Sequence, residues 1–379
     1  MLSWLADLQH VWGPFRLFEY GSVRCLGALV TAFILMLVVM PRFIAWLRAK
    51  KYGESGAKNE GAAVVDAARE AKKGTPTMGG LALVGCAILA ALLWCDPVEP
   101  RTWILVTGLA AFAAVGYLDD RTKIFKGAGG TPESVKFSLL ILVSGAGGAA
   151  LWWLGAHGAP APEGVVRAAD QLVLPFVPMT HALALGAWSI LWYAFVATAC
   201  ANAVNFTDGM DGLASGAMII AGLAFCVVAF LVARTDAAAY LGVPWVPGGT
   251  EVAVFCAALV GACLGFLWFN AAPALVFMGD TGSQALGGAL GLAALAVKQE
   301  FLLLLVGAVF VAEAASVLIQ RYVFKATKHR PQGGFRVFRC APLHHHFQMG
   351  GTPETRIVIR FWIIAALGAL LAIATLKVR

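Results

Sequence analysis

The sequence predicts an all-α integral membrane protein of about ten transmembrane helices, and three observations support this class. Apolar residues make up 60% of the 379 residues and charged residues only 13%, whereas soluble domains carry about 25% charged residues. The apolar residues gather in long runs, several of which reach the roughly 20 residues that a helix needs to cross a bilayer. Loops rich and poor in basic residues alternate along the chain. We therefore expect a single polytopic membrane domain over residues 1–379.

The expected spans follow the apolar runs in chain order. The first run is long and is followed by Arg48, Lys50 and Lys51, which favours an anchoring helix over a cleavable signal peptide. The eight cysteines form no Cys-x-x-Cys pair and most lie inside apolar runs, so we interpret them as small buried side chains. The expected spans are 22–47, 78–95, 102–118, 137–155, 183–203, 214–233, 252–269, the short and glycine-rich 283–297, 301–323 and 358–377.

The basic residues predict the orientation, because short loops rich in Lys and Arg favour the cytoplasm. The loops after the first, third and ninth expected spans hold most of them, and the intervening loops hold one each, namely Arg101, Arg167, Arg234 and Lys298. Both termini are therefore expected outside. The net charge of +7 is largely explained by this asymmetry, so it does not indicate nucleic-acid binding. The remaining basic residues could bind phosphate groups or anionic membrane lipids.

Four polar clusters fall in loops that this orientation places on the cytoplasmic face. They are Asp119-Asp120-x-x-Lys123, the stretch from Asn202 to Gly212, Asn270 with Phe277–Gly282, and Pro342–Phe347. Ionisable groups at membrane depth are costly and are functional candidates by default. We expect the site to be formed by cytoplasmic loops at 48–77, 119–136, 204–213, 270–282 and 324–357.

The acids of these clusters suggest a metal and a phosphate. Neighbouring carboxylates such as Asp119 and Asp120 repel one another unless a cation or proton compensates. Carboxylate oxygens beside phosphate-binding groups suit Mg²⁺. Helix starts near Gly212 and Gly282 would direct free N–H groups at an anion. Ordinary membrane turns and helix packing are the alternative interpretation of these glycines.

Two further motifs leave alternatives open. In Lys72–Gly80 the threonine hydroxyls and a lysine could contact phosphate, or the motif could be positive charge followed by a helix start. At most two of the consecutive histidines His344–His346 can reach one site. Zinc is disfavoured because no cysteine or second histidine pair has zinc spacing, so we prefer imidazole beside phosphate. Glu313 and Gln320 in the ninth span could be buried polar partners.

Five motifs in this order resemble the phospho-N-acetylmuramoyl-pentapeptide transferases, within the polyprenyl-phosphate N-acetylhexosamine-1-phosphate transferase superfamily. The resemblance runs from about Pro41 to the C-terminus. It departs in the first loop, 48–73, which is longer and alanine-rich and lacks a histidine before Gly-Thr-Pro-Thr, and Phe206 and Met210 replace leucine. The motifs are Lys73–Gly80 (KGTPTMGG), Asp119–Lys123 (DDRTK), Asn205–Leu213 (NFTDGMDGL), Phe277–Gly282 (FMGDTG) and Ala341–Phe347 (APLHHHF).

The resemblance implies a dimeric enzyme of the bacterial inner membrane with ten helices. It would transfer phospho-MurNAc-pentapeptide from UDP-MurNAc-pentapeptide to undecaprenyl phosphate, giving lipid I and UMP, with Mg²⁺ as cofactor. It implies Asp280 as the metal ligand and Asp119, Asp120, Asp280, His344 and His345 as catalytic candidates. The resemblance also places His345 around the nucleoside and diphosphate, and Lys136 near the lipid phosphate. The expected substrate-binding residues are Thr75, Lys123, Lys136, Asn205, Asp208, Gly209, Asp211, Asn270, Phe277, Gln320 and His346.

Two rival functions stay open from the residues. A polyprenyl-phosphate GlcNAc-1-phosphate transferase would share the paired aspartates, although the triple histidine favours the muramoyl enzyme. An ion-coupled transporter would carry charged pairs near the membrane midplane on broken helices. Here the acids lie at helix ends, and only Glu313 suits a transporter. Whether the lipid phosphate attacks directly or through an aspartyl-phosphate also stays open, and we favour direct attack.

Overall fold

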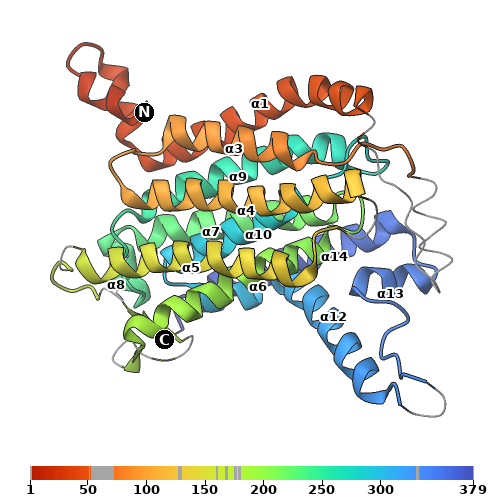
Figure 1. The fold of residues 1–379 in the computed structure, drawn as a ribbon. Helices are drawn as coiled ribbons and strands as arrows, with labels where there is room; N and C mark the ends of the chain where they lie inside the picture. Colours follow the sequence, from red (N-terminus) through yellow and green to blue (C-terminus); the bar gives the residue numbers. More distant parts are fainter. Residues whose placement is uncertain are drawn as a thin grey trace.

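The structure, a computed structural model, describes residues 2–50, 52, 72–126, 130–158, 161–166, 170–174, 177, 181–329 and 333–378. Most of the expected loop 48–77, including Lys58 and Arg69, lies outside the described residues, as do Arg167 and Arg330. The described helices run side by side as a bundle (Figure 1). They are α1 (Gly21–Ala49), α3 (Gly80–Trp94), α4 (Pro100–Lys126), α5 (Glu133–His157), α6 (Ser189–Thr207), α7 (Leu213–Val232), α8 (Thr235–Leu241), α9 (Gly249–Asn270), α10 (Gly279–Ala296), α11 (Leu303–Val306), α12 (Ala308–Thr327), α13 (Leu343–Met349) and α14 (Glu354–Thr375).

Short elements complete the described chain. Two 3-10 helices, η1 (Leu2–Leu8) and η2 (Gly13–Glu19), precede α1, and two more lie at Gly186–Trp188 and Glu300–Leu302. Strands β1 (Gln171–Leu172) and β2 (Leu183–Ala184) pair antiparallel, with Gln171 opposite Ala184. These strands belong to the connection between α5 and α6.

Each of the ten expected spans overlaps helix in the described chain, although 183–203 begins in strand β2, so the all-α membrane class is confirmed. Seven described helices are long and apolar enough to cross a membrane, and a bent pair of helices would make eight. The remaining two segments are α3, which is apolar but short, and α10, whose first turns hold Asp280 and Gln284. The count of ten spans stays a prediction.

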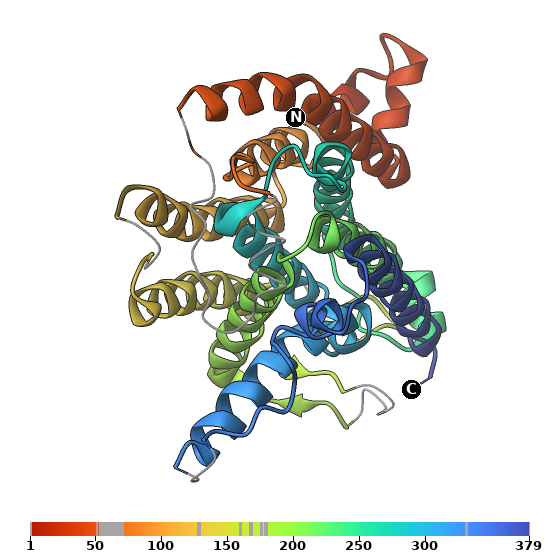
Figure 2. The same cartoon turned by 90° about the vertical axis from the view of Figure 1, so that its right-hand side faces the viewer.

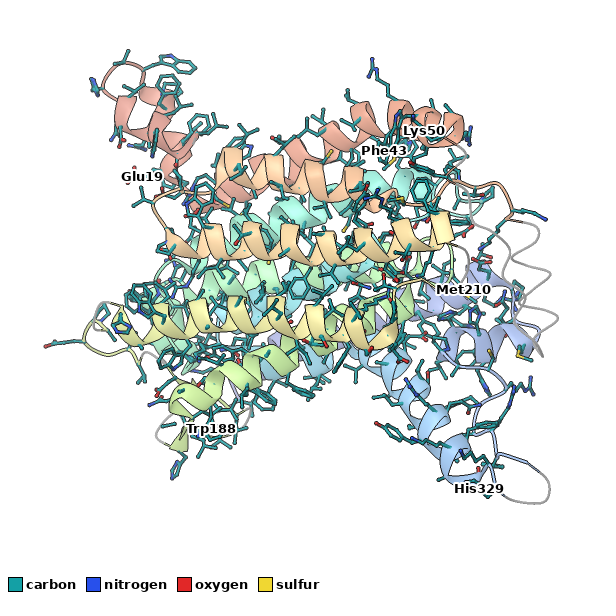
Figure 3. All side chains as sticks on the ribbon, in the orientation of Figure 1. Glu19, Phe43, Lys50, Trp188, Met210 and His329 are labelled. Atoms are coloured by element: carbon teal, nitrogen blue, oxygen red, sulfur yellow. The ribbon has the colours of Figure 1, made fainter. Side chains whose placement is uncertain are left out.

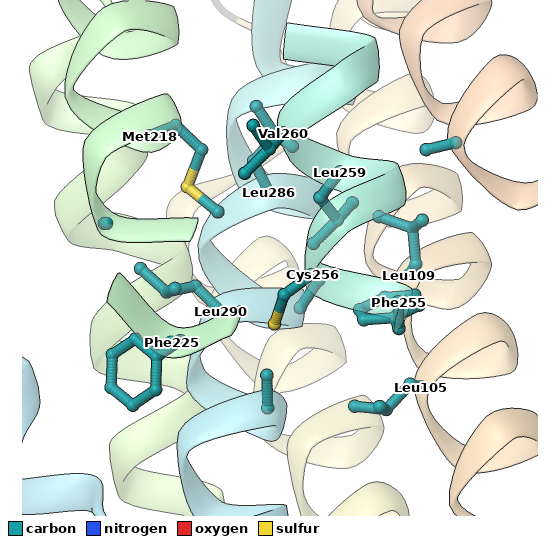
Figure 4. Packing of buried hydrophobic residues seen from close by; sticks show 14 of the residues in the cluster. Leu105, Leu109, Met218, Phe225, Phe255, Cys256, Leu259, Val260, Leu286 and Leu290 are labelled. Carbon is teal, nitrogen blue, oxygen red and sulfur yellow. The ribbon is translucent and has the colours of Figure 1, made fainter. Parts of the chain in front are cut away.

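Helix α10 forms the centre of the bundle. Every residue from Thr281 to Ala296 is buried, and Figure 2, which looks onto the bundle from one end, shows α10 surrounded by the other helices. Figure 4 shows Leu286 and Leu290 of α10 among buried side chains of α4, α7 and α9. Small residues allow helices to pack closely inside a membrane. The glycines and alanines that make this segment weakly apolar therefore place it against protein rather than lipid.

The expected ninth span is not one straight helix, which corrects the prediction of a single span over 301–323. Residues Glu300–Val306 and Ala308–Thr327 meet at Gly307 with a bend of 87°. A Cβ atom at Gly307 would lie 2.6 Å from the carbonyl oxygen of Leu303, so the tight break leaves no room for a side chain. In Figure 1 helix α12 leaves the bundle at an angle toward the lower right.

The two ends of the bundle differ in what they carry. Figure 3 labels Lys50, Met210 and His329 at one end and Glu19 and Trp188 at the other. Both termini lie at the end with Glu19 (Figure 1), which fits the expected even number of crossings. We call the end with Lys50 and Met210 the site end. That it faces the cytoplasm stays a prediction.

The connections at the site end are shorter than expected, because several helices extend beyond the predicted spans. Helix α4 continues through Asp119 and Asp120 to Lys126, and α10 begins at Gly279, before Asp280. The connections between helices are therefore 127–132, 208–212 and 271–278 instead of the longer loops predicted. A helix satisfies its own backbone groups at the edge of the hydrocarbon, so continuing it is cheaper than opening a loop there.

Candidate active site

Two carboxylates and two lysines form the centre of the site end. The Nζ atom of Lys123 lies 2.9 Å from Asp119 Oδ2 and 3.1 Å from Asp280 Oδ2. Lys136, from the first turn of α5, donates to the same two carboxylates, at 3.1 Å to Asp119. Asp119 and Asp280 therefore face one another across shared ammonium groups, although they come from α4 and α10. The backbone N–H of Thr131 donates to the other oxygen of Asp119 at 2.8 Å.

Asp120, the neighbour of Asp119, has different partners. Its Oδ1 accepts from the backbone N–H of Asp280 at 3.0 Å. Its Oδ2 accepts from the backbone N–H of Thr281 at 2.9 Å and from the Thr281 hydroxyl at 2.6 Å. Asp120 thus caps the start of α10 from a neighbouring helix, which satisfies N–H groups that a helix end leaves unpaired. These two N–H groups are consequently not free to bind the anion predicted at this helix start.

Gly279 makes that cap possible. Its φ of 75° is in the left-handed region, and a Cβ atom there would lie 2.8 Å from Asp120 Oδ2. Glycine adopts such a φ without steric cost. A side chain would both strain the turn and push against the capping carboxylate.

Helix α6 contributes the amide that orients Asp280. Asn205 Nδ2 donates to Asp280 Oδ1 at 3.0 Å and to the Ser283 hydroxyl at 2.9 Å. Gln284, one turn after Asp280 in α10, donates to Asp280 Oδ2 at 3.3 Å. Asp280 is thus held from both sides by amides and ammonium groups, with its side chain 15% exposed.

A second charged cluster lies around Asp211 in the 208–212 connection. Lys72 Nζ lies 2.6 Å from Asp211 Oδ1 and 2.6 Å from Glu354 Oε1. Glu354 also accepts from the backbone N–H of Asp211 at 2.8 Å, and Asp211 accepts from the N–H of Ala274 at 3.0 Å. Burial opposes the charge of Lys72, but hydrogen bonds to Asp211 and Glu354 prevail and raise its pKa above 10.5.

Backbone and amide contacts join the loops around this cluster. Asn270 accepts from the N–H of Gly212 at 3.0 Å and from the Ser215 hydroxyl at 3.2 Å, while its Nδ2 donates to the carbonyl of Val276 at 3.0 Å. The Gly212 N–H is therefore not free to bind the anion predicted at this helix start. The N–H of Phe277 donates to Pro76 at 2.8 Å, which pairs the segment before α3 with the segment before α10.

The three histidines point to three different places. His344 is buried and contacts Glu313, with 3.1 Å between Nδ1 and Oε2. His345 Nδ1 lies 2.8 Å from Gln348 Oε1. His346 Nδ1 accepts from the backbone N–H of Arg339 at 3.1 Å. His344 packs on the Asp208–Gly212 turn, because a Cβ on Gly209 would lie 2.3 Å from its Nε2.

The structure thus brings most of the predicted residues to one end, in three adjoining groups. Asp119, Asp120, Lys123, Lys136, Asn205 and Asp280 form the centre, Asp211, Asn270 and Phe277 form the neighbouring loops, and His344 lies against Gly209. Gln320 instead bonds the backbone of Phe338, at 3.0 Å and 3.3 Å. The N–H of Thr75 donates to the Lys72 carbonyl at 3.1 Å, within its own turn.

Sequence reasoning gave no role to three residues of this network. Glu354 was not singled out, although an acid directly after Pro353 at a helix start is a capping signal. Thr281 and Gln284 follow Asp280 at one and four residues, and helical spacing places the latter beside it. Glu313 was considered but not assigned to the site.

The donor set at the centre fits a hard cation with few protein ligands. Asp119 and Asp280 are two facing carboxylates, which is the number that Mg²⁺ usually takes alongside water and substrate phosphate. No group of three or more His, Cys, Asp or Glu side chains is placed to hold a metal in the described part of the chain. Zinc and calcium sites draw on larger protein ligand sets.

Comparison with known proteins identifies the relatives of this chain. Residues 102–298 match the model of glycosyl transferase family 4. A phospho-N-acetylmuramoyl-pentapeptide-transferase of Solidesulfovibrio magneticus is 43% identical over 377 residues, covering 99% of both chains. The protein of the same name from Nitratidesulfovibrio vulgaris is 44% identical over 369 residues, covering 96% of both chains. Together with the motifs assembled at the site end, this similarity shows that the chain belongs to the phospho-N-acetylmuramoyl-pentapeptide-transferase family.

Proposed function

We propose that this protein transfers phospho-MurNAc-pentapeptide from UDP-MurNAc-pentapeptide to undecaprenyl phosphate, forming lipid I and releasing UMP. The observation that carries the proposal is the facing pair Asp119 and Asp280, bridged by Lys123 and Lys136 at the end of the membrane helices. A water-soluble nucleotide and a membrane-bound phosphate can meet at such a boundary. The relatives' shared name supplies the substrate class.

The reaction exchanges one diphosphate linkage for another, so catalysis depends on positioning and charge neutralisation. An oxygen of the lipid phosphate attacks the phosphorus that carries the sugar. The bond from that phosphorus to the bridging oxygen breaks, and UMP leaves with that oxygen. Lys123 and Lys136 are placed to balance the negative charge of both phosphates. Because the second pKa of a phosphate is near 6, the attacking group is mostly ionised and needs little help from a base.

The two adjacent aspartates then have separate roles. Asp119 shares its lysine partners with Asp280 and is placed to contact the reacting phosphates or to accept a residual proton. Both carboxylate oxygens of Asp120 accept hydrogen bonds from the backbone of Asp280 and Thr281, so we assign Asp120 to positioning Asp280. This division favours direct attack over an aspartyl-phosphate on Asp120, whose oxygens are already engaged.

We propose Mg²⁺ as the cofactor, held by Asp280 with Asp119 beside it. When bound, Mg²⁺ would neutralise charge on the diphosphate. The residues of the chain supply the rest, with Asn205 and Gln284 fixing the orientation of the Asp280 carboxylate. Activity is expected to disappear with a chelator and to return when Mg²⁺ is added.

The proposal includes the bacterial inner membrane, the site end facing the cytoplasm, and a homodimer. The cytoplasmic orientation rests on the basic loops at the site end and on the cytoplasmic origin of nucleotide sugars. The dimer rests on the family resemblance alone, and the mass of the detergent-solubilised protein tests it.

A substrate comparison tests the function. Purified protein is supplied with undecaprenyl phosphate and Mg²⁺, and UMP release is measured with UDP-MurNAc-pentapeptide and with UDP-GlcNAc. We expect release only with the muramoyl substrate. Release with UDP-GlcNAc alone would identify the sister transferase instead, and ion flux in liposomes without any UMP would support a transporter.

A further inference from the structure

Glu313 is a buried carboxylate that the proposed chemistry leaves without a role. It lies in α12 beyond the bend at Gly307, and its side chain is 0% exposed. Its partner His344, in the first turn of α13, is 1% exposed. A charge removed from water is costly unless it is paired and hydrogen-bonded. The contacts of Glu313 therefore indicate what it stabilises.

Those contacts fix the position of the imidazole. Glu313 Oε2 lies 3.1 Å from His344 Nδ1. The backbone N–H of His344 lies 3.2 Å and 3.4 Å from the two oxygens of Glu313. A carboxylate only accepts hydrogen bonds, so a hydrogen bond at this contact requires the hydrogen on Nδ1. In the neutral ring the lone pair is then on Nε2.

The Nε2 atom faces the turn beside the central carboxylates. It is buried and has no hydrogen-bond partner among the residues that the structure describes. A Cβ on Gly209 would lie 2.3 Å from Nε2 and 2.7 Å from Cε1, so the ring packs directly on the Gly209 backbone. Gly209 follows α6, whose Asn205 orients Asp280. A buried polar atom without a partner calls for an explanation, and a group on the bound substrate would supply one.

We propose that Glu313 is a positioning residue that holds His344 in the tautomer with hydrogen on Nδ1. The Nε2 atom then offers a hydrogen-bond acceptor at the Gly209 turn, and becomes a donor if the ring is protonated. A buried carboxylate orients imidazole in this way in the serine-protease triad, where changing it to an amide inverts the tautomer. The inference rests on the proposed function, since it takes the Gly209 turn to bind the nucleotide substrate.

The decisive variant is Glu313→Gln, which keeps the shape of the side chain. Its amide can donate to Nδ1, so the ring is free to adopt the opposite tautomer. We expect kcat/KM for UMP release to fall by about tenfold or more, mainly through a raised KM for the nucleotide, because the lost hydrogen bond is one made to the bound substrate. Glu313→Asp, which remains an acceptor only, should retain more activity than Glu313→Gln.

Nitrogen NMR of ¹⁵N-histidine-labelled protein in lipid nanodiscs reads the tautomer directly. His344→Asn identifies the signals by their loss. The wild type should show a protonated Nδ1 and an unprotonated Nε2, and Glu313→Gln should reverse or mix them. A wild-type tautomer and a wild-type kcat/KM in Glu313→Gln would overturn the inference.

Two controls separate positioning from a general loss of structure. Ser316→Ala removes a buried hydroxyl that donates to the Glu313 carbonyl at 2.7 Å on the same helix, and it should keep activity within about twofold. In a His344→Asn background, Glu313→Gln should cause little further loss, because residues that act together are not additive. Additive losses would contradict the inference. If the wild type releases no UMP, the proposed function fails, while the NMR measurement still tests the Glu313–His344 pairing.

Discussion

Asp119 and Asp120 show how adjacent residues on one helix acquire different roles. Successive side chains on an α-helix point about 100° apart. Asp119 therefore meets Lys123 and Lys136, whereas Asp120 meets the start of α10. Sequence reasoning treated the pair as equivalent catalytic candidates. Only the position of α10 distinguishes the two aspartates, and the sequence around the pair does not predict where α10 packs.

This difference gives a prediction for stability. In Asp120→Asn one capping oxygen becomes a hydrogen-bond donor, which leaves a buried N–H of Asp280 or Thr281 unpaired, at a cost of about 1–3 kcal/mol. Asp119→Asn should keep the hydrogen bond from Thr131 and lose mainly charge. Both variants should lose at least about tenfold in activity, but only Asp120→Asn should melt at clearly lower temperature. Equal melting temperatures in detergent would contradict the capping role.

The ion cluster of Lys72 gives a prediction for pH. A lysine whose folded pKa exceeds 10.5 contributes stability in full below pH 10.5, and loses it as pH rises through the folded pKa. The difference in melting temperature between the wild type and Lys72→Met should therefore be constant from pH 7 to about 10 and shrink above that. Lys328→Met, at an exposed position, is the control and should show no such trend. A difference that grows above pH 10.5 would refute the pairing with Asp211 and Glu354.

At the scale of elements, the site depends on loops that hold helix ends together. The hydrophobic runs predicted the approximate positions of the helices, and each expected span overlaps helix in the described chain. The bend at Gly307 did not follow, because hydropathy contains no information on angle. Nor did the contacts of Lys72, whose partners lie 139 and 282 residues further along the chain.

Asn270 tests the importance of these loop contacts. Asn270→Ala removes an acceptor for the Gly212 N–H and the Ser215 hydroxyl, and a donor to Val276. We expect a loss of about 1–3 kcal/mol in the free energy of unfolding, since buried polar groups are left unpaired, together with a raised KM for the nucleotide. Asn202→Ala is a matched control, because its amide bonds only its own helix at Thr198 among the contacts described. Similar destabilisation by both variants would argue against a stabilising role of the Asn270 contacts with Gly212, Ser215 and Val276.

At the scale of the whole molecule, distant segments meet at one end of a two-ended bundle. The polar clusters and the basic loops predicted that these segments meet at one end, because both features occur in every second connection between spans. The arrangement of the clusters around one another could not be predicted, since it depends on the buried, small-residue helix α10 at the centre. The small residues that give α10 a low hydropathy made it a weak candidate for a membrane span. The same small residues allow the other helices to pack closely around it.

Orientation in the membrane gives a prediction at this scale. A cysteine placed at Lys328, near the site end, should resist a membrane-impermeant maleimide added to intact cells. A cysteine placed at Asp236, whose side chain is 68% exposed near the opposite end, should react. Labelling is compared with the parent chain, whose described cysteines are buried or half-buried. The reverse pattern would place the site outside the cell.

The most direct test of the central claim is UMP release from UDP-MurNAc-pentapeptide by Asp280→Asn across a Mg²⁺ titration. Asp280 contacts both lysines and Asn205, and it is the proposed metal ligand. The variant should fold, shown by a melting temperature close to the wild type, yet release UMP at least about a hundredfold more slowly and show no saturation with Mg²⁺ in the wild-type range. A folded Asp280→Asn protein with wild-type rate and Mg²⁺ dependence would contradict a catalytic centre at this carboxylate pair.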